Sequence, residues 1–431
     1  MHDSRPGRRV AIVAGLRTPF AKSGTVFRDV SATALARHAA RELLIRAELD
    51  GREVDEVIFG QVVPSVRVPN VAREVSLLPQ LLPSVPAYSL NRACASAAQA
   101  VTNAADQIAL GHADVVLAGG VESLSDIPVL HSRRFSQILV EAGKAKSMGR
   151  RIGTLARTRP RDLMPVTPAV AEPSTGETMG QSAEKMAKEN GISRDAQDRI
   201  ALQSHRRAAA ATEDGRLTAE IAPWFGGPGM DQIVASDNGI RPDTSLEALA
   251  ELRPVFDRRY GSVTAGNSSP LTDGAAAVLL MAEDKATALG YRPLAYLRSY
   301  AVAAVDPSWQ LLMGPVYAVP RALERAALGW SDLGLVEIHE AFAAQVLSNV
   351  QAWGSAAWAE RLGLAGPVGE VDWDRTNLAG GSIAIGHPFG ATGARLVTTL
   401  AHEMGRRDLQ FGLISICAQG GMGHALVLER D

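Results

Sequence analysis

The stretch AYSLNRACASAAQAVTNAADQIALGHADVVLAGG, residues 87–120, decides the fold class. It reads as an apolar strand, a turn, a helix of small residues and a second apolar strand. Residues 377–421, NLAGGSIAIGHPFGATGARLVTTLAHEMGRRDLQFGLISICAQGG, run in a related order of loop, helix, strand and glycine turn. Helices that alternate with apolar strands favour an α/β protein, in which mixed sheets are covered by helices.

A second pair of similar segments indicates that the two halves of the chain repeat one α/β unit. Residues 34–63 read as an amphipathic helix, a turn and a strand, and residues 319–342 repeat that order late in the chain. Between the halves the pattern changes, and helical runs at 177–191 and 193–211 lie in a part rich in Arg, Pro and Met. We predict an N-terminal half at 1–124 with 262–285, an inserted domain at 125–261 and a C-terminal half at 286–431.

Composition excludes several classes of protein. The 431 residues are 46% hydrophobic and 21% charged, as in ordinary globular proteins. With 44 Lys and Arg against 46 Asp and Glu, a net charge of −2 gives no general attraction to nucleic acid. No apolar run reaches the roughly 18 residues of a membrane span, and no signal-peptide pattern is visible, so we expect a cytoplasmic protein. The two cysteines are too few for a disulfide scaffold or a four-ligand zinc site.

Cys94 lies in NRACASAA, residues 91–98, where a helix is expected to begin. The free N–H groups and positive dipole of a helix N-terminus favour a thiolate, and the small neighbours leave room for a substrate. The alternative is a packing role, since free cysteine is among the most buried residue types.

Three further groups carry candidate chemistry. His387 precedes Pro388 at an expected helix start, where Gly386 and Gly390 permit close backbone approach. Its role is either chemical, as a base or an oxyanion donor, or structural, as a capped histidine in a glycine-rich turn. Cys417 ends an apolar strand, a usual place for catalytic groups in α/β folds. His339 and Glu340 also end a strand and are either functional or an exposed polar pair.

Together these segments resemble the thiolases. The resemblance covers nearly the whole chain and rests on seven ordered motifs: RTPFAKSGT at 17–25, NRACASAAQAV at 91–101, LAGGVESLSD at 117–126, SVTAGNSSPLTDGAAAVLL at 262–280, HEAFAAQ at 339–345, NLAGGSIAIGHPFGATGAR at 377–395 and CAQGGMGHA at 417–425. It implies the thiolase fold, in which two mixed five-stranded sheets and helices form α-β-α-β-α layers, with an inserted loop domain.

The resemblance also implies roles for particular residues. Cys94 is expected to be the nucleophile, His387 its base and Cys417 a second acid/base. One oxyanion site would use His387 and a water held by the first residue of the N-E-A-F motif, where this chain has His339. The other would use the backbone N–H groups of Cys94 and Gln419. Contacts to the pantetheine of CoA are expected at Ala265, Ser269, Ala341 and Phe342.

Two residues at the expected site differ from the usual thiolase pattern. His339 replaces Asn, so an imidazole would have to hold the water. Gln419 replaces Gly, which a backbone donor tolerates unless the position needs a positive φ. The H-E-A-F form and the insertion resemble the β subunit of the trifunctional fatty-acid oxidation complex and its bacterial relatives.

The insertion carries a basic, partly amphipathic stretch at 131–161. By resemblance, and by its pattern, it is expected to contact an anionic membrane or a partner; the alternative is a solvated helical face. The resemblance further implies a homodimer or a dimer of dimers and a hydratase/dehydrogenase α subunit as partner.

The expected activity is degradative 3-ketoacyl-CoA thiolysis in fatty-acid β-oxidation, with CoA as substrate and no metal or redox cofactor. Three alternatives stay open. They are an acetoacetyl-CoA-specific acetyltransferase, a ketoacyl synthase on the same fold, which would not need Cys417, and a non-catalytic lipid-binding or scaffold subunit.

Overall fold

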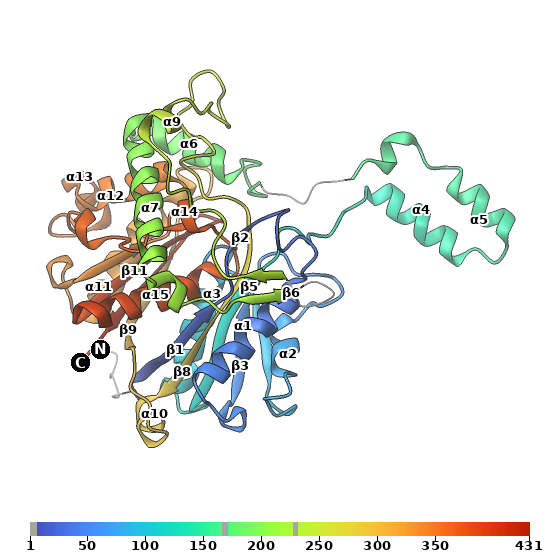
Figure 1. Cartoon of the computed structure of the whole chain (residues 1–431). Helices are drawn as coiled ribbons and strands as arrows, with labels where there is room; N and C mark the ends of the chain where they lie inside the picture. Colours follow the sequence, from blue (N-terminus) through green and yellow to red (C-terminus); the bar gives the residue numbers. More distant parts are fainter. Residues whose placement is uncertain (1–6, 166–170, 227–231) are drawn as a thin grey trace.

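The computed structural model describes residues 7–165, 171–226 and 232–431 (Figure 1). Nine strands follow one another across the main sheet of these residues in the order β10-β11-β12-β9-β1-β8-β5-β3-β4. The strands are β1 Val10–Arg17, β3 Glu56–Gly60, β4 Ala87–Leu90, β5 Val115–Glu122, β8 Thr272–Ala282, β9 Ala295–Ala304, β10 Leu335–Ile338, β11 Phe411–Ala418 and β12 Met422–Glu429. The two-residue strand β2, Ala21–Lys22, pairs with β8.

The sheet is mixed, and the two halves of the chain meet within it. In the N-terminal half β3 pairs in parallel with β4 and β5, while β8 runs antiparallel to β5 and β1. In the C-terminal half β10 pairs in parallel with β11, and β12 runs antiparallel to β11 and β9. A short antiparallel pairing of β1 with β9, at Ala11 and Ile12, joins the two expected sheets into one continuous sheet.

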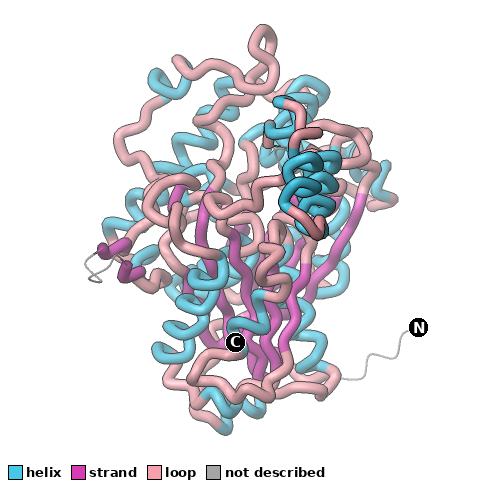
Figure 2. The backbone as a smooth tube through the Cα atoms, turned by 90° about the vertical axis from the view of Figure 1, so that its right-hand side faces the viewer, coloured by secondary structure: helices cyan, strands magenta, loops and turns pink. Residues whose placement is uncertain are grey.

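Helices surround the strands of the sheet (Figure 2). They pack against its two portions through three apolar cores, of which the central one is shared by both portions. The helices of the two halves are α1 Ala32–Arg46, α2 Val71–Ser76, α3 Ser96–Ala109, α10 Glu283–Ala288, α11 Gly314–Ala326, α12 Ala343–Trp353, α13 Ala356–Leu362, α14 Ser382–Ile385 and α15 Thr392–Arg407. Short 3-10 turns lie at Gly51–Glu53, Pro160–Leu163, Leu311–Met313, Trp330–Asp332 and Trp373–Arg375.

The cores show why these strands are apolar throughout. Val116 and Ala118 of β5 face a core shared with α3 and α15, whereas Val115 and Leu117 face the core under α1 and α2. In β11, Ile414 also faces the shared core and its neighbour Leu413 the core under α11 and α12. Because side chains alternate along a strand, a sheet covered on both faces needs apolar residues at every position. The α-β-α-β-α layers are confirmed.

The central helices α3 and α15 are in close contact because glycine allows it. A Cβ on Gly393 would lie 2.3 Å from the backbone nitrogen of Ala98, too close for any side chain. Since α3 follows the Cys94 turn and α15 follows the His387 loop, this contact brings the beginnings of the two helices together.

The chain between β5 and β8 carries the remaining elements. They are α4 Arg133–Lys144, α5 Met148–Leu155, α6 Met179–Glu189, α7 Arg194–Glu213, α8 Arg216–Ala219, β6 Trp224–Gly226, β7 Gln232–Val234 and α9 Leu246–Ala250. The helical runs expected at 177–191 and 193–211 are therefore confirmed as α6 and α7. Helices α4 and α5 pack against each other as a hairpin that projects from the body of the molecule (Figure 1).

Candidate active site

Cys94 lies in a tight turn between β4 and α3. Ala93, just before it, has a φ of 46°, an uncommon conformation for a residue with a side chain. Two side chains hold the turn: Asn91 Oδ1 accepts a hydrogen bond of 2.8 Å from the Ala93 N–H, and the Ser96 hydroxyl donates one of 2.6 Å to the Ala93 carbonyl. Backbone strain that is held in this way is common at functional sites.

Burial opposes the dipole-stabilised thiolate that is expected at Cys94. The helix α3 begins at Ser96, two residues after the cysteine. Burial raises the pKa of the Cys94 thiol to about 12, although the backbone N–H groups of Gln419 and of Cys94 itself act in the opposite direction. At neutral pH Cys94 is therefore a thiol, and it needs a base in contact with it to become a nucleophile.

His387 is buried in the loop between α14 and α15, and the helix start expected at this residue is wrong. The helix α15 begins at Thr392, because residues 388–391 form a turn whose Gly390 N–H donates to the buried carboxylate of Glu122, at 3.1 Å. The close approach expected at Gly390 is confirmed, since a Cβ there would lie 2.3 Å from the Val121 carbonyl oxygen. The His387 Nδ1 atom lies 2.6 Å from the Thr392 hydroxyl.

His339 follows β10 and is fully buried, which contradicts the exposed-pair alternative. Its Nδ1 atom lies 3.0 Å from the hydroxyl of Ser382, and that hydroxyl accepts a hydrogen bond of 3.0 Å from the guanidinium of Arg395. Arg395 is itself fully buried and lies 3.7 Å from the carboxylate of Glu337.

The structure brings Cys94, His339 and His387 together. The Cys94 sulfur and one nitrogen of each imidazole all lie within 4.8 Å of one another, and the ring centroids of the two histidines are 4.1 Å apart. Each histidine has an Nε2 atom without a hydrogen-bond partner among the described residues. In the described part of the chain this is also the one cluster of three groups of the types that bind zinc.

The electrostatic surroundings keep both imidazoles neutral at physiological pH. Burial, with a smaller contribution from the positive charge of Arg395, lowers the pKa of His387 to about 3. Burial, His387 and Arg395 lower the pKa of His339 well below its usual value. A neutral imidazole carries one N–H and one lone pair, so each ring is available as a base or as a donor according to its tautomer.

Glu340 lies beside this cluster but its carboxylate is occupied by structural hydrogen bonds. One oxygen accepts from the Asn377 amide at 2.7 Å; the other accepts from the Ser204 hydroxyl at 2.7 Å and from the Ile383 N–H at 3.3 Å. Burial raises the pKa of Glu340, and these donors oppose the rise. Glu340 thus ties the end of β10 to helix α7 and to the loop before His387.

Cys417 lies near the end of β11, and Gln419 lies on the turn that joins β11 to β12. Burial and the neighbouring Cys94 sulfur raise the pKa of the Cys417 thiol well above its usual range, so Cys417 carries its proton at neutral pH. The backbone N–H of Gln419 is directed at the Cys94 sulfur. The positive φ angles of this turn fall on Gly420 and Gly421 and not on Gln419, which explains why glutamine is tolerated there.

The four residues expected to contact pantetheine lie on two adjoining segments. The backbone N–H and the hydroxyl of Ser269 both donate to the Ala341 carbonyl, at 3.0 and 3.1 Å. Phe342 is partly buried and packs edge-to-face against Phe256, with ring centroids 6.2 Å apart, while Ala265 is exposed. Leu271 forms a β-bridge with His387, so these segments continue directly into the Cys94 cluster.

Sequence reasoning missed the residues that support the cluster, namely Ser382, Arg395, Thr392 and Glu122. Glu122 is buried, its pKa is raised by burial to about 7, and it accepts from the N–H groups of Val62, Val63 and Gly390. All four lie within the motifs quoted for the resemblance, and a charged residue in a run of small apolar residues was the available signal for Arg395 and Glu122.

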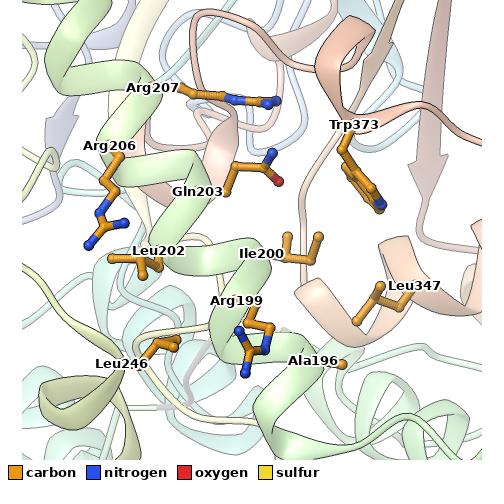
Figure 3. Close-up of a pocket in the computed structure, with 10 residues that line it drawn as sticks. All are labelled: Ala196, Arg199, Ile200, Leu202, Gln203, Arg206, Arg207, Leu246, Leu347 and Trp373. Atoms are coloured by element: carbon orange, nitrogen blue, oxygen red, sulfur yellow. The ribbon is translucent and has the colours of Figure 1, made fainter.

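A groove of about 700 Å³ lies elsewhere, along α7 (Figure 3). Its lining contains none of the residues expected at the active site: Ala196, Arg199, Ile200, Leu202, Gln203, Arg206, Arg207, Leu246, Leu347 and Trp373. Arg207 is held there by a hydrogen bond of 2.5 Å to the Thr376 carbonyl.

No helix in the described ranges is long and apolar enough to cross a membrane.

The chain matches two models of one protein family over most of its length. Residues 10–284 match the family model of the thiolase N-terminal domain, and residues 291–430 match that of the thiolase C-terminal domain. The chain is 50% identical over 429 residues to a 3-ketoacyl-CoA thiolase of Escherichia coli (strain 55989 / EAEC), covering 99% of this chain and 98% of that protein.

Solved structures agree with the family models. The Bacillus anthracis acetyl-CoA acetyltransferase superposes with a TM-score of 0.84 at 33% identity, covering 98% of this chain and 99% of the other. Human mitochondrial 3-ketoacyl-CoA thiolase, also solved in complex with CoA, gives a TM-score of 0.83 at 34% identity, with 98% of both chains covered. The fold and these relatives define an acyltransferase. The chain belongs to the thiolase family.

Proposed function

We propose that this chain is a degradative 3-ketoacyl-CoA thiolase, which uses CoA to cleave a 3-ketoacyl-CoA into acetyl-CoA and a shortened acyl-CoA. The observation that carries the proposal is the convergence of the Cys94 sulfur with His339 and His387 inside one buried site, next to Cys417. CoA is the second substrate, and the chemistry needs no other cofactor.

The first step is attack by Cys94. His387 Nε2 takes the thiol proton, and the sulfur adds to the 3-keto carbon of the substrate. The electron pair of the C=O bond moves to oxygen, and N–H donors in the site stabilise the resulting oxyanion. The need for His387 follows from the pKa of about 12 for Cys94, since the thiolate is not present in the resting protein.

The second step breaks the bond between Cα and Cβ. The oxyanion re-forms its carbonyl, now as a thioester on Cys94, and the bonding pair leaves on acetyl-CoA as an enolate. Cys417 donates its thiol proton to the enolate carbon, a role that suits a thiol whose raised pKa keeps it protonated. The proton on His387 then returns to the Cys417 thiolate through water. A CoA thiol gives its proton to His387 and attacks the Cys94 thioester, and His387 passes this proton to the Cys94 sulfur as the shortened acyl-CoA leaves.

Glu340 acts in this proposal as a positioning residue. Its carboxylate accepts hydrogen bonds from Asn377, Ser204 and the Ile383 N–H. It therefore fixes the positions of His339 and of the loop before His387, and it has no contact with a reacting atom. Pantetheine would lie along Ala265, Ser269, Ala341 and Phe342, because these segments lead to the Cys94 cluster.

We also propose the division of the chain into domains, its oligomeric state, its location and its partner. The division into 1–124 with 262–285, 125–261 and 286–431 is supported by the helices that occupy the chain between β5 and β8 and by the pairing of β1 with β9. We propose a homodimer or a dimer of dimers in the cytoplasm. A hydratase/dehydrogenase α subunit as partner rests on the resemblance to the trifunctional complex.

The leading alternative is an acetoacetyl-CoA-specific acetyltransferase, which the likeness to the Bacillus anthracis acetyl-CoA acetyltransferase keeps open. A non-catalytic lipid-binding subunit is the alternative from another class. The test is CoA-dependent cleavage of acetoacetyl-CoA and of a long-chain 3-ketoacyl-CoA by the purified chain, with and without a chelator.

We expect cleavage of both substrates, a higher kcat/KM for the long one, and no effect of the chelator. Cleavage of acetoacetyl-CoA alone would favour the acetyltransferase. Absence of cleavage, repeated with an added α subunit, would favour the non-catalytic subunit.

The α4–α5 hairpin supports a proposed contact with an anionic membrane through residues 131–161. Its apolar side chains include Val140, Met148 and Ile152, which are 55%, 67% and 61% exposed. Exposed cations flank them, and exposed apolar residues beside cations are typical of helices that lie in a membrane interface.

Neutralising cations on this hairpin should therefore weaken membrane binding without slowing catalysis. We choose Arg133→Gln and Arg150→Gln, because Arg134 and Arg151 hold the hairpin together through Asp162 and the Ala142 carbonyl. At about 1 kcal/mol per charge the double variant should bind anionic vesicles roughly 10- to 30-fold more weakly in a sedimentation assay. Equal binding by the variant, or no binding of anionic vesicles by the unaltered protein, would indicate a solvated face instead.

A further inference from the structure

The hydroxyl of Ser382 lies between Arg395 and His339, and its contacts with these two residues determine which ring nitrogen of His339 carries the proton. A guanidinium can only donate, so the 3.0 Å contact from Arg395 makes Ser382 Oγ an acceptor. The hydroxyl must then place its own proton elsewhere. Among the described residues, the one further hydrogen-bond contact of this oxygen is His339 Nδ1, at 3.0 Å. Ser382 is fully buried, so bulk water is not an alternative acceptor.

We propose that Ser382 and Arg395 are positioning residues that hold His339 in the tautomer with its proton on Nε2, while His387 is held in the opposite tautomer. His339 then presents a fixed N–H donor to the active site. If Nδ1 of His339 carried the proton instead, the Ser382 oxygen would accept from both Arg395 and His339, and the buried hydroxyl proton would have no acceptor among the described residues.

His387 has a different partner and so receives the other tautomer. The hydroxyl of Thr392 donates to the Pro388 carbonyl at 3.0 Å, one turn back along the chain. Its oxygen is therefore free to accept the Nδ1–H of His387 at 2.6 Å, which leaves the lone pair on Nε2. Because the two rings lie only 4.1 Å apart, one Nε2–H beside one Nε2 lone pair is favourable, whereas two Nε2–H groups would repel.

With these tautomers the two adjacent histidines have different roles. His387 Nε2 is the base that takes the Cys94 proton, and His339 Nε2–H is a donor to an oxyanion, directly or through a water. This catalytic consequence rests on the proposed function, whereas the tautomers themselves do not. An asparagine at position 339 would offer an N–H without depending on any neighbour; histidine offers one only when its tautomer is fixed, which is the task assigned to Ser382 and Arg395.

The test is ¹⁵N NMR of the full-length protein labelled at histidine, in which protonated and unprotonated ring nitrogens have well-separated shifts. The two rings are assigned from His339→Asn and His387→Asn. We expect His339 to be protonated at Nε2 and His387 at Nδ1. Because this measurement uses resting protein, it decides the tautomers even if the proposed thiolysis fails.

The matched variants are Ser382→Ala and Ser415→Ala. Ser415 is also buried and close, since its carbonyl accepts the His339 backbone N–H at 2.8 Å, but its hydroxyl has no partner among the described residues. Ser382→Ala should give His339 a mixture of tautomers and lower kcat roughly 10- to 100-fold with little change in KM. Ser415→Ala should change neither.

Wild-type His339 protonated at Nδ1 would overturn the proposal. So would a Ser382→Ala protein in which His339 keeps its Nε2 proton and kcat stays normal. If Ser382→Ala does not fold, the wild-type spectrum alone still decides the assignment.

Discussion

Cys94→Ser is expected to lower the rate of CoA-dependent cleavage of a 3-ketoacyl-CoA by roughly 10³-fold or more. A serine hydroxyl is a poorer nucleophile and a poorer leaving group than a thiol, and the ester that it forms resists attack by the next CoA. The measurement is kcat and KM with a long-chain substrate. Exchange of labelled CoA into an acyl-CoA, which involves the same thioester, should fall by a similar factor.

The matched control for this prediction is a fold comparison by circular dichroism and thermal unfolding. The Ala93 strain and the Asn91 and Ser96 hydrogen bonds do not involve the Cys94 sulfur, so the turn should survive the substitution. A folded Cys94→Ser protein with near-normal turnover would show that another group carries the acyl chain.

Cys417→Ala should separate the two halves of the reaction. Loss of the proton donor to the enolate should slow cleavage by about 10²- to 10⁴-fold. Exchange of CoA into an acyl-CoA involves only bonds to sulfur and needs no carbon protonation. That exchange should therefore continue at a rate within a few-fold of the wild-type rate, measured with labelled CoA and a saturated acyl-CoA.

The contrast between Cys94→Ser and Cys417→Ala also tests the ketoacyl synthase alternative. A synthase does not use a second catalytic cysteine, so Cys417→Ala would retain carbon–carbon bond chemistry. Equal loss of cleavage and of exchange in a folded Cys417→Ala protein would contradict the separate role given to Cys417 and would indicate disruption of the turn that carries Gln419.

Much of the fold could be predicted from the sequence, because the two halves repeat one pattern of helix and apolar strand. Burial on both faces of the sheet makes the strands apolar throughout, and glycines such as Gly393 mark the close contact of α3 with α15. The pairing of β1 with β9 could not be read in this way. It involves only two residues of each strand, Ala11 with Tyr296 and Ile12 with Ala295, which are far apart in the chain, and neither segment carries a pairing signal.

The members of the candidate site could be predicted, but their chemical state could not. The sequence predicts helix starts near Cys94 and His387, whereas helices α3 and α15 begin at Ser96 and Thr392, because each residue lies in a turn held by side-chain hydrogen bonds. Burial, which a single sequence does not reveal, reverses the expected effect on the Cys94 thiol. Proton positions depend on hydroxyl groups such as Ser382, whose partners are known only from the fold.

The most direct test of the account is mass spectrometry of the protein after incubation with a long-chain 3-ketoacyl-CoA and no free CoA. We predict a mass increase equal to the acyl chain shortened by two carbons, located on the peptide that contains Cys94 and removed by added CoA. No adduct, or an adduct on Cys417 that turns over with CoA, would contradict the assignment of Cys94 as the nucleophile.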